Sequence, residues 1–462
     1  MKNVTSIGAG GIIFILCAVI PLWLVATSTA SVLSAQVAVE FEEIGGTLRD
    51  GTVYLIRVPK NWNKTVINDL DYATKPDTDT RTYWLRQGYA TSGTQRHPLR
   101  QFLYDPLQEA YNQVRVLDLL EKQFGKPDRV IQYGQSGGGL VAAGMAEVHP
   151  DRVDGVISAC FQTPIPLHNM RVDMFFALRA LVAPDRELTI VDIPDDPNSV
   201  VADWRKVITT AQKTVQGRAR IALAMTIGQH PSWTDPLMPE PKPQNVDAVQ
   251  ESMFHSIVQQ VILQNFRTRQ RNENAGGGVF VWNTGIDYEK FFNNGYESHK
   301  QLVRTLYREA GLDLQADLAQ INQSPRIAAD PDVINEFWRV APRTLNGDPQ
   351  VPVFQFGTLG DNQSPQEQMQ GYEARVRAQG KGHLYRQAVV HAAGHCTFTV
   401  SERAVAVETM MRRLDTGYWP STSPKTLNAL ANSLNLDESR FIHHDWPKFN
   451  RGFYPDSEID QQ

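Results

Sequence analysis

The stretch Arg129-Val130-Ile131-Gln132-Tyr133-Gly134-Gln135-Ser136-Gly137-Gly138-Gly139 is the most informative part of the sequence. Residues 129–133 have the pattern of a strand, and residues 139–148 have that of an apolar helix. Ser136 therefore lies on a sharp strand-to-helix bend, where the glycines two positions before and after it remove Cβ clashes. This context makes Ser136 a candidate nucleophile. An inert serine in a glycine-rich turn is the alternative interpretation.

The chain around this bend alternates between strand-like and helix-like segments. Strands are expected at residues 53–58, 65–70, 89–94 and 153–160, and helices at 80–87 and 106–124. Strands that alternate with helices are typical of a mostly parallel sheet with helices on both faces. The predicted fold class is therefore α/β.

The alternation stops at residue 161 and returns near residue 350. A strand is expected at residues 351–356, a helix at 365–379, a strand at 383–390 and a helix at 401–414. The simplest organisation is one α/β core, residues 36–160 and 349–417, divided by a mainly helical insertion over residues 161–348. Residues 418–462 form a C-terminal extension without a periodicity that predicts its structure.

The N-terminus has the pattern of a secretory signal. Lys2 precedes an apolar run over residues 12–26, and small residues follow it up to Ala35. We expect cleavage after Ala30 or Ala35, which leaves a mature protein in the periplasm or outside the cell. An uncleaved signal anchor is the alternative, although Pro21 interrupts the apolar run. No later run is long enough to span a bilayer.

Composition narrows the classes of function. The 462 residues include 42% hydrophobic and 21% charged side chains, and the net charge is −5 with no long basic run. This is a globular composition, and it gives no electrostatic support for binding nucleic acid. The sequence contains no zinc-ligand signature, and Gly8-Ala9-Gly10-Gly11 does not follow a strand as a dinucleotide site requires. We therefore expect a small-molecule substrate, no cofactor and no metal.

A serine nucleophile needs a base and an acid that orients the base, and these follow in the order Ser, Asp or Glu, His in this architecture. Asp361 comes after the strand at 351–356, and His395 comes after the last strand, so both are expected at the catalytic edge of the sheet. His391 is the competing base. Glu367 or an acid in the insertion is the competing acid.

These residues resemble the α/β-hydrolase superfamily over about residues 50–160 and 350–415. Ser136 matches the nucleophile, Asp361 the acid and His395 the base. Within the superfamily, the chain is similar to exported bacterial esterases and amidases with a helical lid. The resemblance implies acyl transfer to water through an acyl-enzyme.

The resemblance also implies an oxyanion hole with two backbone N–H donors. One is expected from Gly137. The second normally comes from the loop after the third strand, which reads Asp69-Leu70-Asp71-Tyr72 here and lacks the His-Gly of many members. Leu70 and Asp71 are the leading candidates, with Tyr72 also able to donate. Two carboxylates beside an oxyanion oppose its charge unless they point away.

Three further sets of residues lie where they can act. Arg96 and His97 follow the strand at 89–94 and are candidates for substrate binding, or else a solvated loop pair. Cys160 and Cys396 are a candidate disulfide, with two free buried thiols as the equal alternative. The aromatic residues between 280 and 296 line an acyl pocket or pack the insertion.

The sequence thus predicts a secreted serine hydrolase with a carboxylic ester of a small molecule as the leading substrate. An amidase is the close second, and a peptidase the third. Transfer of the acyl group to an alcohol and a non-catalytic binding protein remain as alternatives. The acyl group, the leaving group and the oligomeric state are left open.

Overall fold

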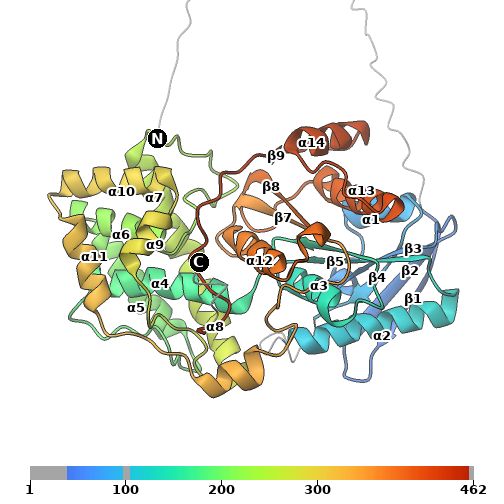
Figure 1. The fold of residues 1–462 in the computed structure, drawn as a ribbon, viewed down its shortest axis with the longest axis horizontal. Helices are drawn as coiled ribbons and strands as arrows, with labels where there is room; N and C mark the ends of the chain where they lie inside the picture. The colour runs from blue at the N-terminus through green and yellow to red at the C-terminus, as the bar shows by residue number, and fades with distance from the viewer. Residues whose placement is uncertain (1–38, 97–104, 457–462) are drawn as a thin grey trace, which may run out of the picture. The chain divides into compact units, whose positions relative to one another are not determined.

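The computed structural model describes residues 39–96 and 105–456, and within them nine strands form one sheet in the order β1-β2-β4-β3-β5-β6-β7-β8-β9. Neighbouring strands from β4 through β8 are parallel, whereas β1, β2 and β9 pair antiparallel (Figure 1). The expected α/β class is confirmed. The strands are β1 Phe41–Thr47, β2 Val53–Pro59, β3 Thr65–Asp69, β4 Ala90–Thr94, β5 Arg129–Gln135, β6 Gly155–Ala159, β7 Val353–Gly360, β8 Tyr385–Ala393 and β9 Phe441–Ile442.

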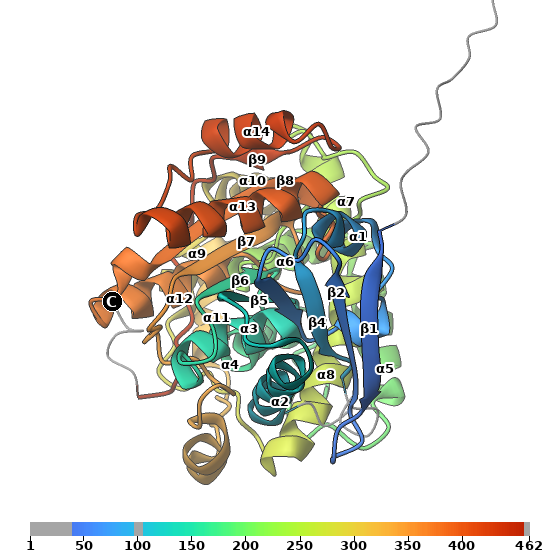
Figure 2. The ribbon, with the colours of Figure 1, turned by 90° about the vertical axis from the view of Figure 1, so that its right-hand side faces the viewer.

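Helices cover both faces of the sheet, as Figure 2 shows. Consecutive residues of β5 explain why: Val130 packs into the hydrophobic cluster beneath α2 and α3, and Ile131 packs into the cluster beneath α1 and α13. Both faces of a central strand must be apolar when both are covered. The core helices are α1 Asp79–Arg86, α2 Pro106–Phe124, α3 Gly137–Val148, α12 Glu367–Ala378, α13 Val400–Thr416 and α14 Pro424–Ser433, with 3-10 turns η1 Tyr72–Thr74 and η5 Gly382–Leu384.

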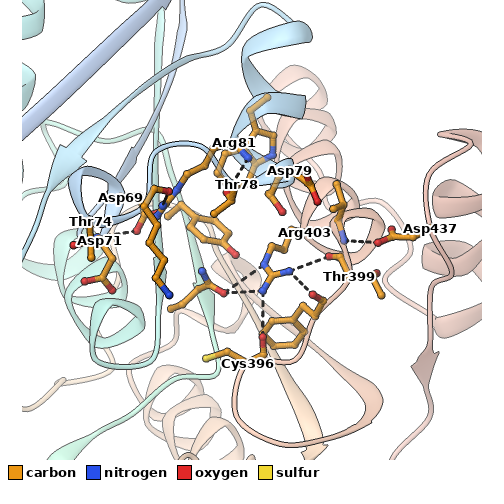
Figure 3. Close-up of a pocket in the computed structure, with 17 residues that line it drawn as sticks. Asp69, Asp71, Thr74, Thr78, Asp79, Arg81, Cys396, Thr399, Arg403 and Asp437 are labelled. Atoms are coloured by element: carbon orange, nitrogen blue, oxygen red, sulfur yellow. Dashed lines mark hydrogen bonds and ion pairs between the residues drawn. The ribbon is translucent and has the colours of Figure 1, made fainter. Parts of the chain in front are cut away.

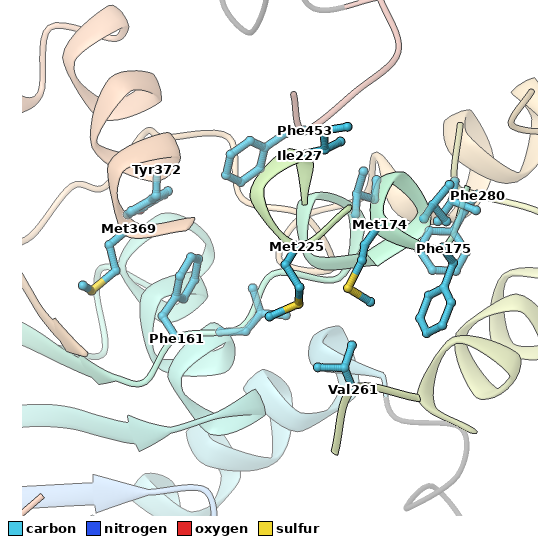
Figure 4. Close-up of a cluster of buried hydrophobic side chains, with 14 of the residues drawn as sticks. Phe161, Met174, Phe175, Met225, Ile227, Val261, Phe280, Met369, Tyr372 and Phe453 are labelled. Atoms are coloured by element: carbon cyan, nitrogen blue, oxygen red, sulfur yellow. The ribbon is translucent and has the colours of Figure 1, made fainter. Parts of the chain in front are cut away.

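The segment between β6 and β7 is mainly helical. Its first helix, α4, is buried along almost its whole length, and its Met174 and Phe175 join one hydrophobic cluster with Met369 and Tyr372 of the α/β core (Figure 4). The insertion is therefore packed onto the core. Its elements are α4 Pro164–Val182, α5 Asn198–Ala211, α6 Val215–Ile227, α7 Val246–Ser256, η3 Ile257–Val261, α8 Ile262–Gly276, α9 Tyr288–Asn294, α10 Glu297–Ala310, α11 Leu314–Gln323 and η4 Val333–Trp338.

The C-terminal extension contacts both parts of the molecule. Its β9 adds an antiparallel edge strand to β8. Further along, the guanidinium of Arg451 contacts the carboxylate of Asp173 on α4 at 2.6 and 2.7 Å, and both side chains are about 1% exposed. Phe453 joins the hydrophobic cluster of the insertion (Figure 4). The extension thus stabilises the position of α4 through an ion pair and hydrophobic packing.

Two sequence predictions fall on parts of the chain outside the described residues. These are the signal segment, residues 1–35, and His97. Within residues 39–96 and 105–456, no helix is long and apolar enough to cross a membrane.

Candidate active site

Ser136 lies on the bend between β5 and α3 with φ 60° and ψ −127°, a strained conformation for a residue with a side chain. The bend requires Gly134, because a Cβ there would lie 2.0 Å from the carbonyl oxygen of Gly138. Gly138 itself has room for a Cβ, which would lie 3.5 Å from the nearest side chain. The tight position is the next one: a Cβ on Gly139 would lie 2.9 Å from the carbonyl of Ala159. The clash argument made from sequence is therefore wrong for Gly138.

The hydroxyl of Ser136 is linked to a histidine and an aspartate. Ser136 Oγ lies 2.7 Å from His395 Nε2, and His395 Nδ1 lies 2.7 Å from Asp361 Oδ2. His395 follows β8 and Asp361 follows β7, so all three side chains meet at the carboxyl ends of parallel strands. With Asp361 accepting from Nδ1–H, His395 Nε2 is the nitrogen that can accept the serine proton.

Asp361 is buried and fully hydrogen-bonded. Its side chain is 1% exposed, and its other oxygen accepts backbone N–H groups from Gln363 and Ser364 at 2.9 Å each. The competing residues lie elsewhere: Glu367 accepts a hydrogen bond from Tyr296, and His391 contacts Glu240 at 2.9 Å.

A disulfide bond joins Cys160 at the end of β6 to Cys396 in the loop of His395, with Cα atoms 5.4 Å apart. Arg403 of α13 supports the same loop, because it donates to the carbonyl oxygen of Cys396 at 3.2 Å and to Gln135 at 3.2 Å. Arg403 therefore links Gln135, which precedes Ser136, to Cys396, which follows His395.

The predicted oxyanion donors lie at the start of α3 and in the loop after β3. The loop packs on Gly138, where a Cβ would lie 3.5 Å from Leu70 and 3.6 Å from the carboxylate of Asp71. The backbone N–H of Asp71 is already donated to the side chain of Asp69, at 3.2 Å. This bond makes Asp71 a poor second donor, so Leu70 is the better of the two predicted candidates, beside Gly137.

The two carboxylates of this loop are neutralised. Asp69 pairs with Arg81, both buried, and Asp71 makes a two-pronged ion pair with Arg96 at 2.9 and 3.0 Å. The predicted conflict between these acids and an oxyanion is thereby removed. Arg96 also lies beside the residue that follows Ser136, because its guanidinium is 3.0 Å from where a Cβ on Gly137 would lie.

The two chain neighbours of Ser136 line different cavities. Gln135 and Cys396 line a cavity of about 620 Å³, the Arg403 cavity. Figure 3 shows Arg403 pointing into it, with Cys396 at one end. Gly137 lines a second cavity of about 150 Å³, the Arg171 cavity, between the core and the insertion. Its other lining residues are Arg96, Leu140, Gln162, Pro164, Leu167, His168, Arg171, Gln264, Thr268, Arg271 and Asn272.

Sequence reasoning missed His168, Arg171 and Arg271, because the insertion matched no motif. A signal was nevertheless present, since Arg171 and Asp173 lie in a mostly apolar helix, where charged residues are rarely buried unless they are paired. The aromatic residues of the 280–296 segment include Phe280 and Tyr288, both fully buried, and they pack the insertion without lining either cavity.

Among the described residues, Cys160, His395 and Cys396 form the one cluster with metal-ligand atoms within 4.8 Å of one another. Two of them share the disulfide, so they offer no thiolates. This cluster is therefore a poor metal site.

No protein-family model matches the chain. The chain is 39% identical over 445 residues to the o-phthalyl amidase from Xanthobacter agilis, which covers 90% of this chain and 98% of that protein. Among solved structures, feruloyl esterase B from Aspergillus oryzae has a TM-score of 0.40 and 14% identity over 83% of this chain and 82% of that chain. Candida antarctica lipase A has a TM-score of 0.37 and 13% identity over 85% of each chain. The identity and coverage of the first match, together with the sheet described above, establish that the chain belongs to the family of that amidase, in the α/β-hydrolase superfamily, and is a hydrolase of small-molecule esters or amides.

Proposed function

We propose that this protein is a serine amidase that removes an aromatic acyl group of the o-phthalyl type from an amine. The observation that carries the proposal is the unbroken chain of contacts from Ser136 Oγ to His395 to Asp361, each 2.7 Å long. The name of the 39% identical relative supplies the acyl group and the amide bond. Esters, the leading expectation from sequence alone, become the second substrate class.

The reaction has two halves. His395 Nε2 takes the proton as Ser136 Oγ attacks the carbonyl carbon, while Asp361 stabilises the imidazolium and backbone N–H groups hold the oxyanion. His395 then donates that proton to the nitrogen of the leaving amine as the C–N bond breaks. In the second half, water attacks the acyl-enzyme with His395 as the base, which releases the carboxylic acid and restores Ser136.

The two cavities fit the two halves of such a substrate. The leaving amine must lie close to His395 to receive its proton, and the Arg403 cavity meets the His395 loop at Cys396. The Arg171 cavity meets the nucleophile from the other side, at Gly137. We therefore place the acyl group in the Arg171 cavity and the leaving group toward the Arg403 cavity.

The test is turnover by the purified protein of matched aryl amides and aryl esters of phthalic acid. Ser136→Ala should abolish both reactions and labelling by a fluorophosphonate, whereas Ser433→Ala, an exposed serine at the end of α14, should change neither. Hydrolysis of the esters without the amides would assign the protein to the esterases. Full activity in Ser136→Ala would exclude the proposed nucleophile. Silence toward all substrates, without labelling, would favour a binding protein.

We also propose export from the cytoplasm. The apolar N-terminal segment and the bond between Cys160 and Cys396 support this, because disulfides persist in oxidising compartments. N-terminal sequencing of protein recovered from the periplasm or medium should begin at residue 31 or 36. A full-length chain retained in the cytoplasm would contradict it.

A further inference from the structure

The Arg171 cavity carries an unusual concentration of positive charge. Arg96, Arg171 and Arg271 line it together with His168, and no Asp or Glu is among its lining residues in the described parts of the chain. The nearby acid Asp71 is bound to Arg96. The cavity is therefore a cationic pocket next to the residue that follows the nucleophile.

Arg171 is the buried member of this set. It is 1% exposed, and its one hydrogen bond to described residues runs from Nη2 to the carbonyl of Gln363 at 3.2 Å. Its Nε is buried without an acceptor. Burial, and next the charge of Arg269, lower its pKa to about 9, while the charge of Asp361 opposes the shift.

A second layer of basic groups adds to this charge. Arg269 on α8 is fully buried, and its Nε lies 3.4 Å from Oε1 of Glu273. The guanidinium of Arg269 makes no hydrogen bond to the described residues. The pKa of His168 is held well below its usual value by burial and then by Arg171 and Arg269, so this side chain is neutral and offers hydrogen bonds but no charge. Glu273 is the ion-pair partner of Arg269, and neither Arg269 nor His168 supplies an anion to Arg171.

A buried cation without an anion destabilises a fold strongly, so such a group is retained where a ligand completes the pair. A guanidinium matches a carboxylate, because its parallel N–H groups meet both oxygens. The geometry of Arg171 thus indicates a carboxylate ligand.

The volume and the lining residues of the cavity indicate what else the ligand contains. A volume of about 150 Å³ is that of a cavity able to hold one benzene ring. Leu140, Pro164 and Leu167 supply apolar wall, and Gly137 supplies contact with the reacting centre. The ring must therefore be attached at the carbonyl that Ser136 attacks.

We propose that Arg171 is a specificity-determining residue that binds a carboxylate carried on the acyl ring, close to the scissile carbonyl. Arg96 and Arg271 complete the cationic wall of the same cavity. The inference deepens the proposed function, since it assigns the recognised charge to the acyl half of the substrate and to a residue of the insertion.

The test uses four substrates with one leaving group: an aryl amide and an aryl ester of phthalic acid, and the same two compounds with the second carboxylate replaced by its methyl ester. The amide-to-ester ratio tests the proposed function, and the charged-to-neutral ratio tests Arg171, so the two failures are distinguishable. Wild-type kcat/KM should be higher for the charged pair. Arg171→Met should lower kcat/KM for the charged pair by at least about 30-fold and change the neutral pair by less than about threefold.

Arg179→Met is the matched control, because it makes the same change two turns later on α4, outside the cavity. Arg171→Lys should recover part of the charged-to-neutral ratio. A readout independent of turnover is stabilisation by the product: phthalate should raise the Tm of the wild type and of Ser136→Ala, but not of Arg171→Met. The ligand-free Tm of Arg171→Met should equal or exceed that of the wild type, because an uncompensated charge is removed.

Three results would overturn the proposal. One is an equal loss of activity on charged and neutral substrates. Another is an undiminished phthalate effect on the Tm of Arg171→Met. The third is a charge preference that follows the leaving group when a carboxylate is moved there.

Discussion

Replacing Glu367 with Gln should stabilise the protein, and the gain should grow with pH. Glu367 begins α12 and is 1% exposed. Tyr296 donates a hydrogen bond to one carboxyl oxygen, and the other is buried with no partner among the described residues. Because burial is not offset by a cation, it raises the pKa of Glu367 to about 8.

The change in stability with pH follows from the number of protons that the folded and unfolded states bind. Above its ordinary pKa of 4.5, Glu367 loses its proton in the unfolded chain but keeps it in the folded protein up to about pH 8. The unfolded state then binds fewer protons, so stability falls as pH rises through this window and is level on either side. The loss is about 1 kcal/mol at pH 5, about 3 kcal/mol at pH 7 and about 4 kcal/mol at pH 8. Gln cannot ionise, so Glu367→Gln avoids this loss while keeping an acceptor for Tyr296.

The measurement is urea denaturation followed by tryptophan fluorescence at pH 5, 6, 7 and 8. The difference in unfolding free energy between Glu367→Gln and the wild type should rise by about 3 kcal/mol across this range. Glu309→Gln, at an exposed position on α10, controls for loss of a carboxylate and should show no such trend. A constant difference for Glu367→Gln, or one that falls with pH, would refute the reasoning.

Three further predictions concern the framework of the site. Replacing Cys160 and Cys396 with Ala should lower the free energy of unfolding by about 5 kcal/mol, because the disulfide closes a loop of 236 residues; an unchanged urea midpoint would contradict this. The same variant should have a lower kcat, because the His395 loop is no longer tied to β6. Asp361→Asn should lower kcat on the order of 10⁴-fold with little change in Tm, and a loss below tenfold would exclude its assigned role. Arg451→Met should cost about 3 to 5 kcal/mol by leaving Asp173 charged and buried, and the double variant with Asp173→Asn should recover part of it in a double-mutant cycle.

The sequence predicted the central sheet well, because most central strands contain a short apolar run bounded by turn residues; β4, Ala90-Thr91-Ser92-Gly93-Thr94, is the polar exception. It missed β1, whose residues are mostly exposed and so lack the apolar pattern of a buried strand. It also left β9 unplaced, since two residues carry no periodicity and pair only because β8 offers a free edge. A local pattern thus predicts strands that contain apolar residues and misses strands that form only because they pair with a neighbouring strand.

The same distinction applies to the site. The local bend predicted Ser136, and chain order predicted Asp361 and His395, three residues that are linked in series at hydrogen-bonding distance in the structure. Neither the bend nor the chain order predicts a role for Arg171, because that role depends on which residues surround Arg171 in the folded protein. Spacing also left the pairing of Cys160 with Cys396 open, since only the adjacency of β6 and the His395 loop brings them within 5.4 Å between Cα atoms.

The C-terminal extension positions α4, the helix that carries Arg171. Arg171 and Asp173 lie two residues apart on α4, and Asp173 is fixed by Arg451 and by the hydroxyl of Tyr288 at 2.9 Å. Removing the partner of a buried charge is strongly destabilising, so the pairing of Asp173 with Arg451 holds α4 against the extension. The extension supplies the partner of Asp173, so the orientation of α4 is set without using Arg171. That arrangement leaves the guanidinium of Arg171 available to a ligand at a fixed place beside Gly137. In the proposed mechanism, the core supplies the reacting groups, and the insertion and the extension together select the acyl group.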